Sequence, residues 1–496
     1  MFRNSLILIG AAQVLILLVG LGRAKALAVL AGPSGLGVIA TIDQLIVTLT
    51  QFGALGLPYT ALKFMSAAHS RSADAFRGAY AAYMRVMIVL ALATALGVFV
   101  LFSLRPGVFG AEAARYGSEI QFALLGVAPI MVTFLLAQTF AAAQKPVQAA
   151  LFNLASVGAL AVAAVAGLIM TNLAGLYAAT AATGFVIAAG AIIYLQKAEN
   201  LSLFSAGASI RRELASDPNV VNTAMSVYVT LVGYAACLLV VRYALFDTVG
   251  EAATGLLQSA LAAALSFGAV ISAMVNLSLA PALNRDGSDA AKIATANVFA
   301  GKILLLLFLG AIPVALFPRT VLTLLYTGEF APAAMALTLC IVWQCSHQIM
   351  AVYQQLLVGL NQVRYMAFCA VAGFALSGAL AFILVPAMGL SAGPVALIAG
   401  AVANMALTFA RLASVNRFRA PWRLTLRAGF VVAAVLGAGF LFSLDSEWTF
   451  TGLALRAAYG VAACGALWFL MEGGERALIL SAPKSLLGLT RSPPRQ

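Results

Sequence analysis

Long apolar stretches recur along nearly the whole chain, and they constrain its fold more than any other feature. A helix that crosses the hydrocarbon core of a bilayer needs about 20 mainly apolar residues. Such stretches follow one another with short polar connections, and 63% of the 496 residues are hydrophobic while only 9% are charged. A soluble domain carries about 25% charged residues, so this chain cannot cover a water-facing surface. The sequence predicts an all-α polytopic membrane protein.

We expect about fourteen transmembrane helices, each about 20 residues or longer. Their approximate ranges are 5–31, 35–62, 79–103, 119–143, 147–171, 174–196, 219–243, 252–282, 293–317, 333–359, 365–387, 392–415, 424–444 and 450–471. We expect a six-helix bundle at 1–196, a cytoplasmic linker at 197–218, a second six-helix bundle at 219–418, two additional helices at 419–471 and a cytoplasmic tail at 472–496.

The two bundles show a weak internal repeat. A shift of about 218 residues places Gly37 on Gly255, and Arg23 and Lys25 then straddle the equivalent of Arg242. A unit with an even number of crossings keeps one orientation in both copies. The repeat therefore predicts a pseudo-twofold axis along the membrane normal.

Basic residues in the loops predict the orientation, because cytoplasmic loops carry an excess of Lys and Arg. One set of loops, which also holds both termini, contains Arg3, Arg71, Arg77, Lys145, Lys197, Arg211, Arg212, Arg285, Lys292, Arg364, Arg417, Arg419, Arg423, Arg476, Lys484, Arg491 and Arg495; the opposite set contains Arg105, Arg115 and Arg319. Both termini are thus expected in the cytoplasm. This asymmetry also accounts for the net charge of +13 without a nucleic-acid partner.

Three charged residues lie deep within the first two spans. Arg23 is expected roughly 12 Å below the outer surface, at a rise of 1.5 Å per residue. Asp43 returns to a similar depth on the next span, and Lys25 lies beside Arg23 in the sequence. Ionisable groups at such depth face a partner or a cavity. Two interpretations stay open: a structural Arg23–Asp43 ion pair, or a cationic cavity wall that Asp43 orients.

Arg242 occupies the matching position in the second repeat, so the outer part of the expected cavity holds three cations and one anion. That sign of charge favours an anionic group such as a phosphate or diphosphate and repels organic cations. Arg85 and Lys302, as cytoplasmic-side cations, and Arg456, near the outer end of the last span, are expected to extend to the lipid headgroups.

Uncharged polar side chains also follow the spans. Gln44, Thr48 and Gln51 share one face of the second span, and Gln344, His347 and Gln348 lie on the tenth. Hydrogen bonds between helices explain any one of them. Together they suit a sugar-sized ligand with many hydroxyl groups.

Catalytic and metal-binding patterns are not apparent in the sequence. It has two histidines and no P-loop, which argues against nucleophilic catalysis and ATP hydrolysis. Its five cysteines lack the spacing of metal ligands and are expected to be small buried apolar residues. We therefore expect neither an enzyme nor a cofactor.

Five short motifs, taken in order, resemble the Wzx-type flippases of O-antigen and exopolysaccharide repeat units, a polysaccharide-transporter branch of the MATE-like (MOP) superfamily. They are Ala31-Gly32-Pro33-Ser34-Gly35-Leu36-Gly37, Gly53-Ala54-Leu55-Gly56, Pro281-Ala282-Leu283, Leu325-Tyr326-Thr327-Gly328-Glu329-Phe330, and Gly389 followed by Ala392-Gly393. The resemblance covers residues 1–418. Gly32, where leucine is usual, and the last two spans depart from it.

The resemblance implies a carrier in the bacterial inner membrane that flips a polyprenyl-diphosphate-linked oligosaccharide by alternating access. Its implied partners are that substrate, membrane lipids and other polysaccharide assembly proteins. A lipid II flippase and a MATE-type multidrug or cation antiporter are the alternatives, and a polysaccharide polymerase is an enzymatic one. A single deep carboxylate beside Arg and Lys argues against the antiporter, which needs carboxylates to exchange cations. The absence of a large outer loop in the sequence argues against the polymerase.

Overall fold

The computed structural model describes residues 2–109, 115–205, 210, 218–283, 288–416, 418, 422–442, 449–471 and 476. Within these ranges the regular structure is helical and contains no strand. The all-α prediction is therefore confirmed. The predicted tail beyond residue 472 and the loop with Arg211 and Arg212 lie almost entirely outside the described residues.

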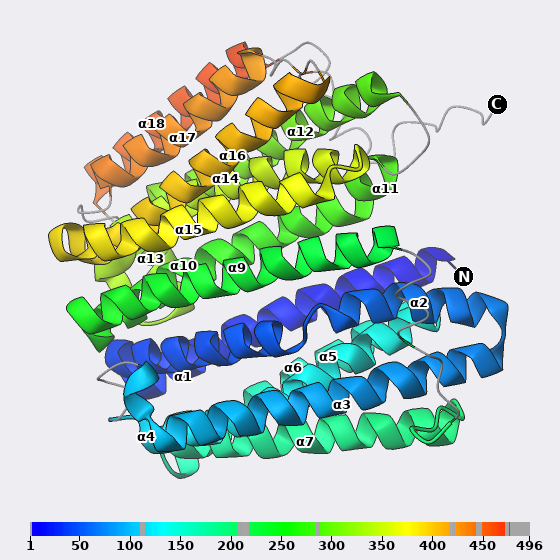
Figure 1. Ribbon diagram of the computed structural model, residues 1–496. Coiled ribbons are helices and arrows are strands. Elements are labelled where there is room, and N and C mark those ends of the chain that lie inside the picture. The colour runs from blue at the N-terminus through cyan, green and yellow to red at the C-terminus, as the bar shows by residue number, and fades with distance from the viewer. Residues whose placement is uncertain are drawn as a thin grey trace. The chain divides into compact units, whose positions relative to one another are not determined.

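The helices follow one another with short connections (Figure 1). They are α1 Phe2–Gly53, α2 Leu57–Arg71, α3 Ala73–Leu104, η1 Pro106–Phe109, α4 Gly117–Leu125, α5 Val127–Ala142, α6 Pro146–Met170, α7 Leu173–Ala198, α9 Pro218–Thr248, α10 Glu251–Met274, η3 Val275–Leu279, α11 Ala280–Leu283, α12 Asp289–Leu316, α13 Pro318–Leu325, η4 Gly328–Ala333, α14 Ala334–Gly359, α15 Val363–Met388, η5 Gly389–Ser391, α16 Ala392–Asn416, α17 Trp422–Phe442 and α18 Phe450–Leu470.

Twelve helical segments in the described part of the chain are long and apolar enough to cross a membrane. Two of them, Leu8–Gly53 with 46 residues and Val363–Ser414 with 52, are each about twice as long as one crossing requires. Each of these two holds two of the predicted spans. The segments therefore agree with a chain that crosses the bilayer about fourteen times.

The first long segment reverses direction at Gly32. Gly32 has φ 62° and ψ −173°, a backbone conformation that glycine reaches without a Cβ clash. In a straight helix Arg23 and Asp43 would lie about 30 Å apart. Their side chains are instead 3.0 Å apart, so the two halves of α1 run back along each other. The second long segment divides in the same way at Gly389, where φ is 54°.

The predicted second span, 35–62, is interrupted. α1 ends at Gly53 and α2 begins at Leu57, because Leu55 and Gly56 both take positive φ. Hydropathy cannot detect this break, since the residues on both sides of it are apolar.

Side-chain caps fix several helix starts. Ser72 accepts a hydrogen bond from Ala75 N at the start of α3, and Asn172 accepts one from Gly175 N at the start of α7. Ser288 and Thr449 do the same for α12 and α18. Each cap satisfies a backbone N–H that has no partner within its helix.

The chain divides into two compact units. The first comprises Met1–Ser259, Thr323–Phe330 and Val363–Gly400, and the second comprises Ala260–Leu322, Ala331–Gln362 and Ala401–Gln496. In the first unit α1 packs against α6 and α9, and α9 packs against α15. In the second, α12 packs against α14 and α17. The predicted bundle boundaries at 196 and 219 remain predictions.

Candidate functional site: a cationic layer in the first unit

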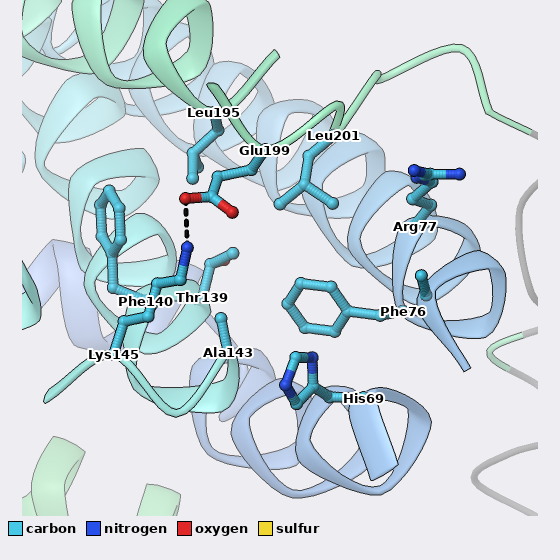
Figure 2. A pocket seen from close by; sticks show the side chains of 11 residues that line it. His69, Phe76, Arg77, Thr139, Phe140, Ala143, Lys145, Leu195, Glu199 and Leu201 are labelled. Carbon is cyan, nitrogen blue, oxygen red and sulfur yellow. Dashed lines mark hydrogen bonds and ion pairs between the residues drawn. The ribbon is translucent and has the colours of Figure 1, made fainter. Parts of the chain in front are cut away.

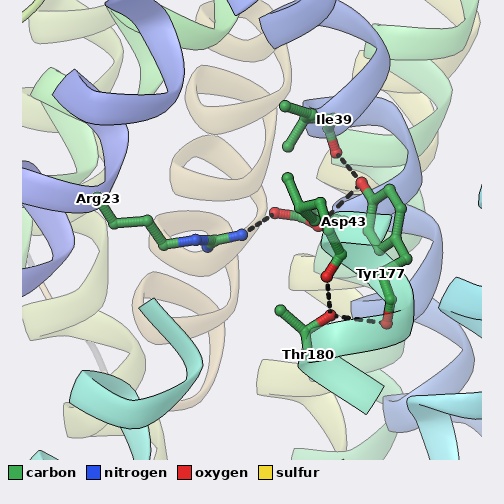
Figure 3. Close-up of polar contacts among 6 residues, drawn as sticks. Arg23, Ile39, Asp43, Tyr177 and Thr180 are labelled. Carbon is green, nitrogen blue, oxygen red and sulfur yellow. Dashed lines mark hydrogen bonds and ion pairs between the residues drawn. The ribbon is translucent and has the colours of Figure 1, made fainter. Parts of the chain in front are cut away.

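Arg23 and Asp43 form an ion pair between the two halves of α1, as their predicted depth suggested (Figure 3). Arg23 Nη2 lies 3.0 Å from Asp43 Oδ2, and each side chain is 33% exposed. Arg23 Nε is buried and has no hydrogen-bond partner. The pair therefore leaves part of the guanidinium's donor capacity unused.

Tyr177 of α7 supports this pair, and the sequence analysis missed it. Its hydroxyl lies 3.2 Å from Asp43 Oδ1 and 3.1 Å from the carbonyl oxygen of Ile39, so it can donate to either (Figure 3). Thr180, one turn further along α7, donates back to Leu176 O or Tyr177 O. The one available signal was a tyrosine within a stretch rich in alanine and glycine.

Arg242 lies in a second polar cluster, formed by α1, α9 and α10. Its Nη1 donates to Gln44 Oε1 at 2.8 Å, and its Nη2 donates to Gln258 Oε1 at 2.7 Å. Gln44 Nε2 in turn donates to Ala235 O at 2.9 Å, and Thr48 also reaches that oxygen. Amide oxygens solvate a guanidinium without neutralising it, unlike the carboxylate beside Arg23.

Lys25 completes the set of predicted cations in this unit. Its side chain is exposed, and Nζ donates to Leu324 O at 2.7 Å. A single carbonyl partner leaves an ammonium group with further donors. The structure thus places the three predicted cations and Asp43 in one unit, with Arg23 and Arg242 held by different partners. We call Arg23, Lys25 and Arg242, together with Asp43, the cationic layer.

The contact between Gly37 and Gly255 supports the internal repeat. A Cβ on Gly37 would overlap the carbonyl oxygen of Glu251, and a Cβ on Gly255 would overlap that of Pro33. Under the predicted shift, Pro33 corresponds to Glu251 and Gly37 to Gly255. Reciprocal contacts of this kind are those that a twofold axis generates.

Arg115 and Tyr116 also contact Glu251, at the start of α10. Arg115 Nη1 lies 3.1 Å from Glu251 Oε1, and the Tyr116 hydroxyl donates to the same oxygen. These contacts join the segment before α4 to α10 at the helix ends where Gly37 and Gly255 meet.

The polar residues predicted on the tenth span lie in the second unit. Gln348 Nε2 donates to Gln344 Oε1 at 3.2 Å, Ser272 donates to Gln348 Oε1 at 3.1 Å, and both glutamines are 2% exposed. The His347 ring lies beside Trp343, with their centroids 5.8 Å apart. Gln348 is therefore hydrogen-bonded to α10 through Ser272, and Gln344 is hydrogen-bonded to Gln348 within α14.

Three further predicted site residues make few contacts. Gln51 is half-buried near the end of α1. Arg85 is exposed and donates to Ala81 O of its own helix, and Lys302 is exposed on α12.

Arg456 corrects a prediction. It was expected to extend to the headgroups, but its side chain is fully buried. Its guanidinium donates to Leu316 O, the last residue of α12, and to Phe442 O, the last residue of α17. It also lies over the Phe317 and Phe442 rings. The guanidinium of Arg456 is thus stabilised by the carbonyls of two helix ends and by two aromatic faces. These contacts replace the water that it would meet if it extended to the headgroups.

The cysteine prediction holds for four residues and is wrong for one. Cys237, Cys340, Cys345 and Cys369 are buried, whereas Cys464 is exposed on α18. The reason is that α18 packs against α17 and α12 while many of its residues are exposed. Within the described ranges, no group of three or more His, Cys, Asp or Glu side chains could hold a metal ion.

Solved structures resemble this chain over most of its length. An inward-facing multidrug-resistance MATE transporter of the MOP superfamily aligns with a TM-score of 0.64 and 14% identity, covering 82% of this chain and 96% of its own. The lipid II flippase MurJ, in an inward closed conformation, aligns with a TM-score of 0.66 and 12% identity, covering 95% of this chain and 100% of its own.

The chain has the fold of the MOP-superfamily transporters. A further MOP-superfamily transporter, from Pyrococcus furiosus, aligns with a TM-score of 0.54 and 12% identity, covering 86% of this chain and 94% of its own, and is described as having a binding pocket of reversed polarity. No protein-family model and no curated protein sequence matches the chain. This fold and the twelve long apolar helical segments of the described chain make it a multi-pass membrane protein.

Proposed function

We propose that this protein is a flippase that moves polyprenyl-diphosphate-linked oligosaccharide repeat units from the cytoplasmic to the periplasmic leaflet. The observation that carries the proposal is the cationic layer of Arg23, Lys25 and Arg242, with Asp43 as the carboxylate paired to Arg23. Charges within spans are costly, so a surplus of positive charge there indicates an anionic ligand.

A diphosphate suits this layer chemically. Guanidinium groups bind phosphate oxygens through paired, charge-assisted hydrogen bonds. Arg23 has unused donor capacity, and Arg242 is held by amides that a phosphate can displace. Gln44, Gln51 and Gln258 add amide groups of the kind that bind sugar hydroxyls. In the proposed cycle the head group passes through a cationic cavity by alternating access while the polyprenyl tail stays in the bilayer.

A lipid II flippase is the second candidate, and one observation favours it. MurJ aligns over 95% of this chain with a TM-score of 0.66. Lipid II is also a lipid-linked molecule, so the two candidates differ in the sugar. A MATE-type cation antiporter fits the charges poorly, because cation exchange needs carboxylates where this layer is mainly cationic.

Direct binding tests the proposal. Purified protein would be titrated with a short-chain prenyl-diphosphate oligosaccharide, the corresponding lipid II analogue, a neutral prenyl oligosaccharide and a lipophilic cation. We expect the diphosphates to bind and the neutral compound and the cation to fail.

Arg242→Gln should weaken diphosphate binding about tenfold or more, since hydrogen bonds to charged groups contribute about 1.5–3 kcal/mol. Arg105→Gln, on an exposed side chain that is not among the predicted site residues, is the matched control. Preferential binding of the lipophilic cation would overturn the proposal.

A further inference from the structure

A cavity of about 190 Å³ lies in the first unit, and none of Arg23, Lys25, Asp43 and Arg242 lines it (Figure 2). It is lined by helix ends: His69 in the last turn of α2, Arg77 in the first turns of α3, Lys145 at the start of α6 and Glu199 at the end of α7. The distribution of basic residues in the loops predicts that this side faces the cytoplasm. Since several helices start or end here, the cavity lies at the level of the lipid headgroups.

The volume limits what this cavity can hold. A phosphate group and a glycerol fit such a space, whereas an oligosaccharide repeat unit does not. The cavity is therefore distinct from the proposed transport site.

Basic groups dominate the polar part of the lining. Lys145 pairs with Glu199, and Arg77 pairs with Asp74 at 2.8 Å, while His69 is exposed with its ring edge against Phe76. The Lys145 and Arg77 side chains are 35% and 39% exposed, so an incoming anion can reach them. Exposed ion pairs are weak, and a phosphate can therefore replace the carboxylates.

The remaining walls are apolar and lead to an aromatic cluster. Phe76, Phe140, Leu195 and Leu201 line the cavity. The Phe140 ring lies 5.5 Å from that of Phe152 and 6.2 Å from that of Tyr194, which is half exposed. Tyrosine at a helix end is typical of the membrane–water interface. A free phosphate would contact only the basic side chains, whereas a phospholipid would contact both the basic and the apolar side chains of the lining.

We propose that this cavity binds the headgroup of an anionic phospholipid from the cytoplasmic leaflet. The phosphate lies between Arg77, Lys145 and His69, and the glycerol and first acyl carbons lie against Phe76 and Phe140. Basic recesses between transmembrane helices on the cytoplasmic side suit such headgroups. The proposal does not depend on the transported substrate.

The test is calorimetric titration of the delipidated, full-length protein in detergent with dioctanoyl-phosphatidylglycerol. We expect saturable binding that Arg77→Gln/Lys145→Gln weakens about tenfold or more. Lys197→Gln is the matched control, because Lys197 is an exposed cation at the end of α7 that does not line the cavity. Glu199→Gln should tighten binding several-fold, since it releases Lys145 from its carboxylate. A purely structural role for the pair predicts no such gain.

Two further ligands identify the source of the phosphate. Zwitterionic dioctanoyl-phosphatidylcholine and inorganic phosphate should both bind at least tenfold more weakly than the phosphatidylglycerol. Equal binding of phosphatidylcholine would show that the cavity does not distinguish an anionic headgroup from a zwitterionic one. Equal binding of inorganic phosphate would show that the cavity is a site for the free ion. Either result overturns the proposal, as does unchanged affinity in the double variant. If the double variant fails to fold, an affinity of Glu199→Gln at or below that of the wild type overturns it.

Discussion

Arg23 and Arg242 occupy related positions in the two repeats but have different partners. Asp43, itself contacted by Tyr177, holds Arg23, whereas two glutamine side chains and a backbone carbonyl hold Arg242. The sequence predicted that Arg23 and Asp43 come to a similar depth, and it offered their ion pair as one of two interpretations. It could not predict Tyr177, because that contact depends on how α7 is rotated against α1.

Replacement of Asp43 distinguishes the roles of this pair. Asp43→Asn removes the carboxylate that competes with a phosphate for Arg23, so diphosphate binding should be retained or become several-fold tighter. Tyr177→Phe, which keeps the ring and removes one donor to Asp43, serves as the milder comparison. Titration with the short-chain diphosphate measures both. A tenfold loss of affinity in Asp43→Asn would show that Asp43 itself contacts the substrate.

Arg456 gives a stability prediction. Arg456→Met keeps a long side chain but leaves Leu316 O and Phe442 O without this donor. An unsatisfied buried polar group costs about 1–3 kcal/mol, so the midpoint of thermal unfolding should fall clearly. Arg105→Met, on an exposed arginine, should leave it nearly unchanged. Equal midpoints for the two variants would contradict the capping role. The sequence placed Arg456 near a membrane surface but could not show that α18 turns it inward.

At the level of the helices, the sequence predicted most spans but missed the break between α1 and α2. Runs of apolar residues set their number, and the glycines at 32 and 389 coincide with reversals. The break between Gly53 and Leu57 depends on the backbone conformation of Leu55 and Gly56. Hydropathy averaged over many residues does not detect it.

The reciprocal contact between Gly37 and Gly255 predicts that no side chain larger than that of glycine fits at either position. Gly255→Ala places a methyl group where Pro33 O lies, and the backbone there cannot give way as a flexible side chain would. We expect α1 and α10 to separate locally and the unfolding midpoint to fall. Gly97→Ala is the control, because a Cβ there meets nothing within 4 Å; it should be neutral or slightly stabilising. Identical behaviour of the two variants would refute the close packing.

For the whole molecule, the first prediction is topology. Single-cysteine variants at Arg115 and Ser446 should react with a membrane-impermeant thiol reagent from the periplasm, and variants at Arg211 and Arg212 should react only after the cytoplasm is opened. The reason is the concentration of basic residues in the loops on one side. The labelling needs a background without Cys464, which is exposed. Labelling of position 115 from the cytoplasm would overturn the orientation.

The membrane potential is the driving force we expect for transport. A diphosphate carries about two negative charges, and moving each from a negative cytoplasm outward gains roughly 2.3 kcal/mol per 100 mV, to the extent that it crosses the field. The empty cationic layer would be drawn inward by the same field. Asp43 holds Arg23 through an ion pair in this account, so transport should not depend on Asp43 as a proton carrier.

The most direct test of the central claim is flipping by the purified protein in liposomes. A fluorescent polyprenyl-diphosphate oligosaccharide would be followed by its exposure to an impermeant quencher, with a membrane potential and a pH gradient imposed separately. We predict flipping that follows the potential, persists in Asp43→Asn and is lost in Arg23→Gln/Lys25→Gln/Arg242→Gln, which should still fold. Flipping by the triple variant at the wild-type rate, or flipping that follows the pH gradient at zero potential and disappears in Asp43→Asn, would contradict the account.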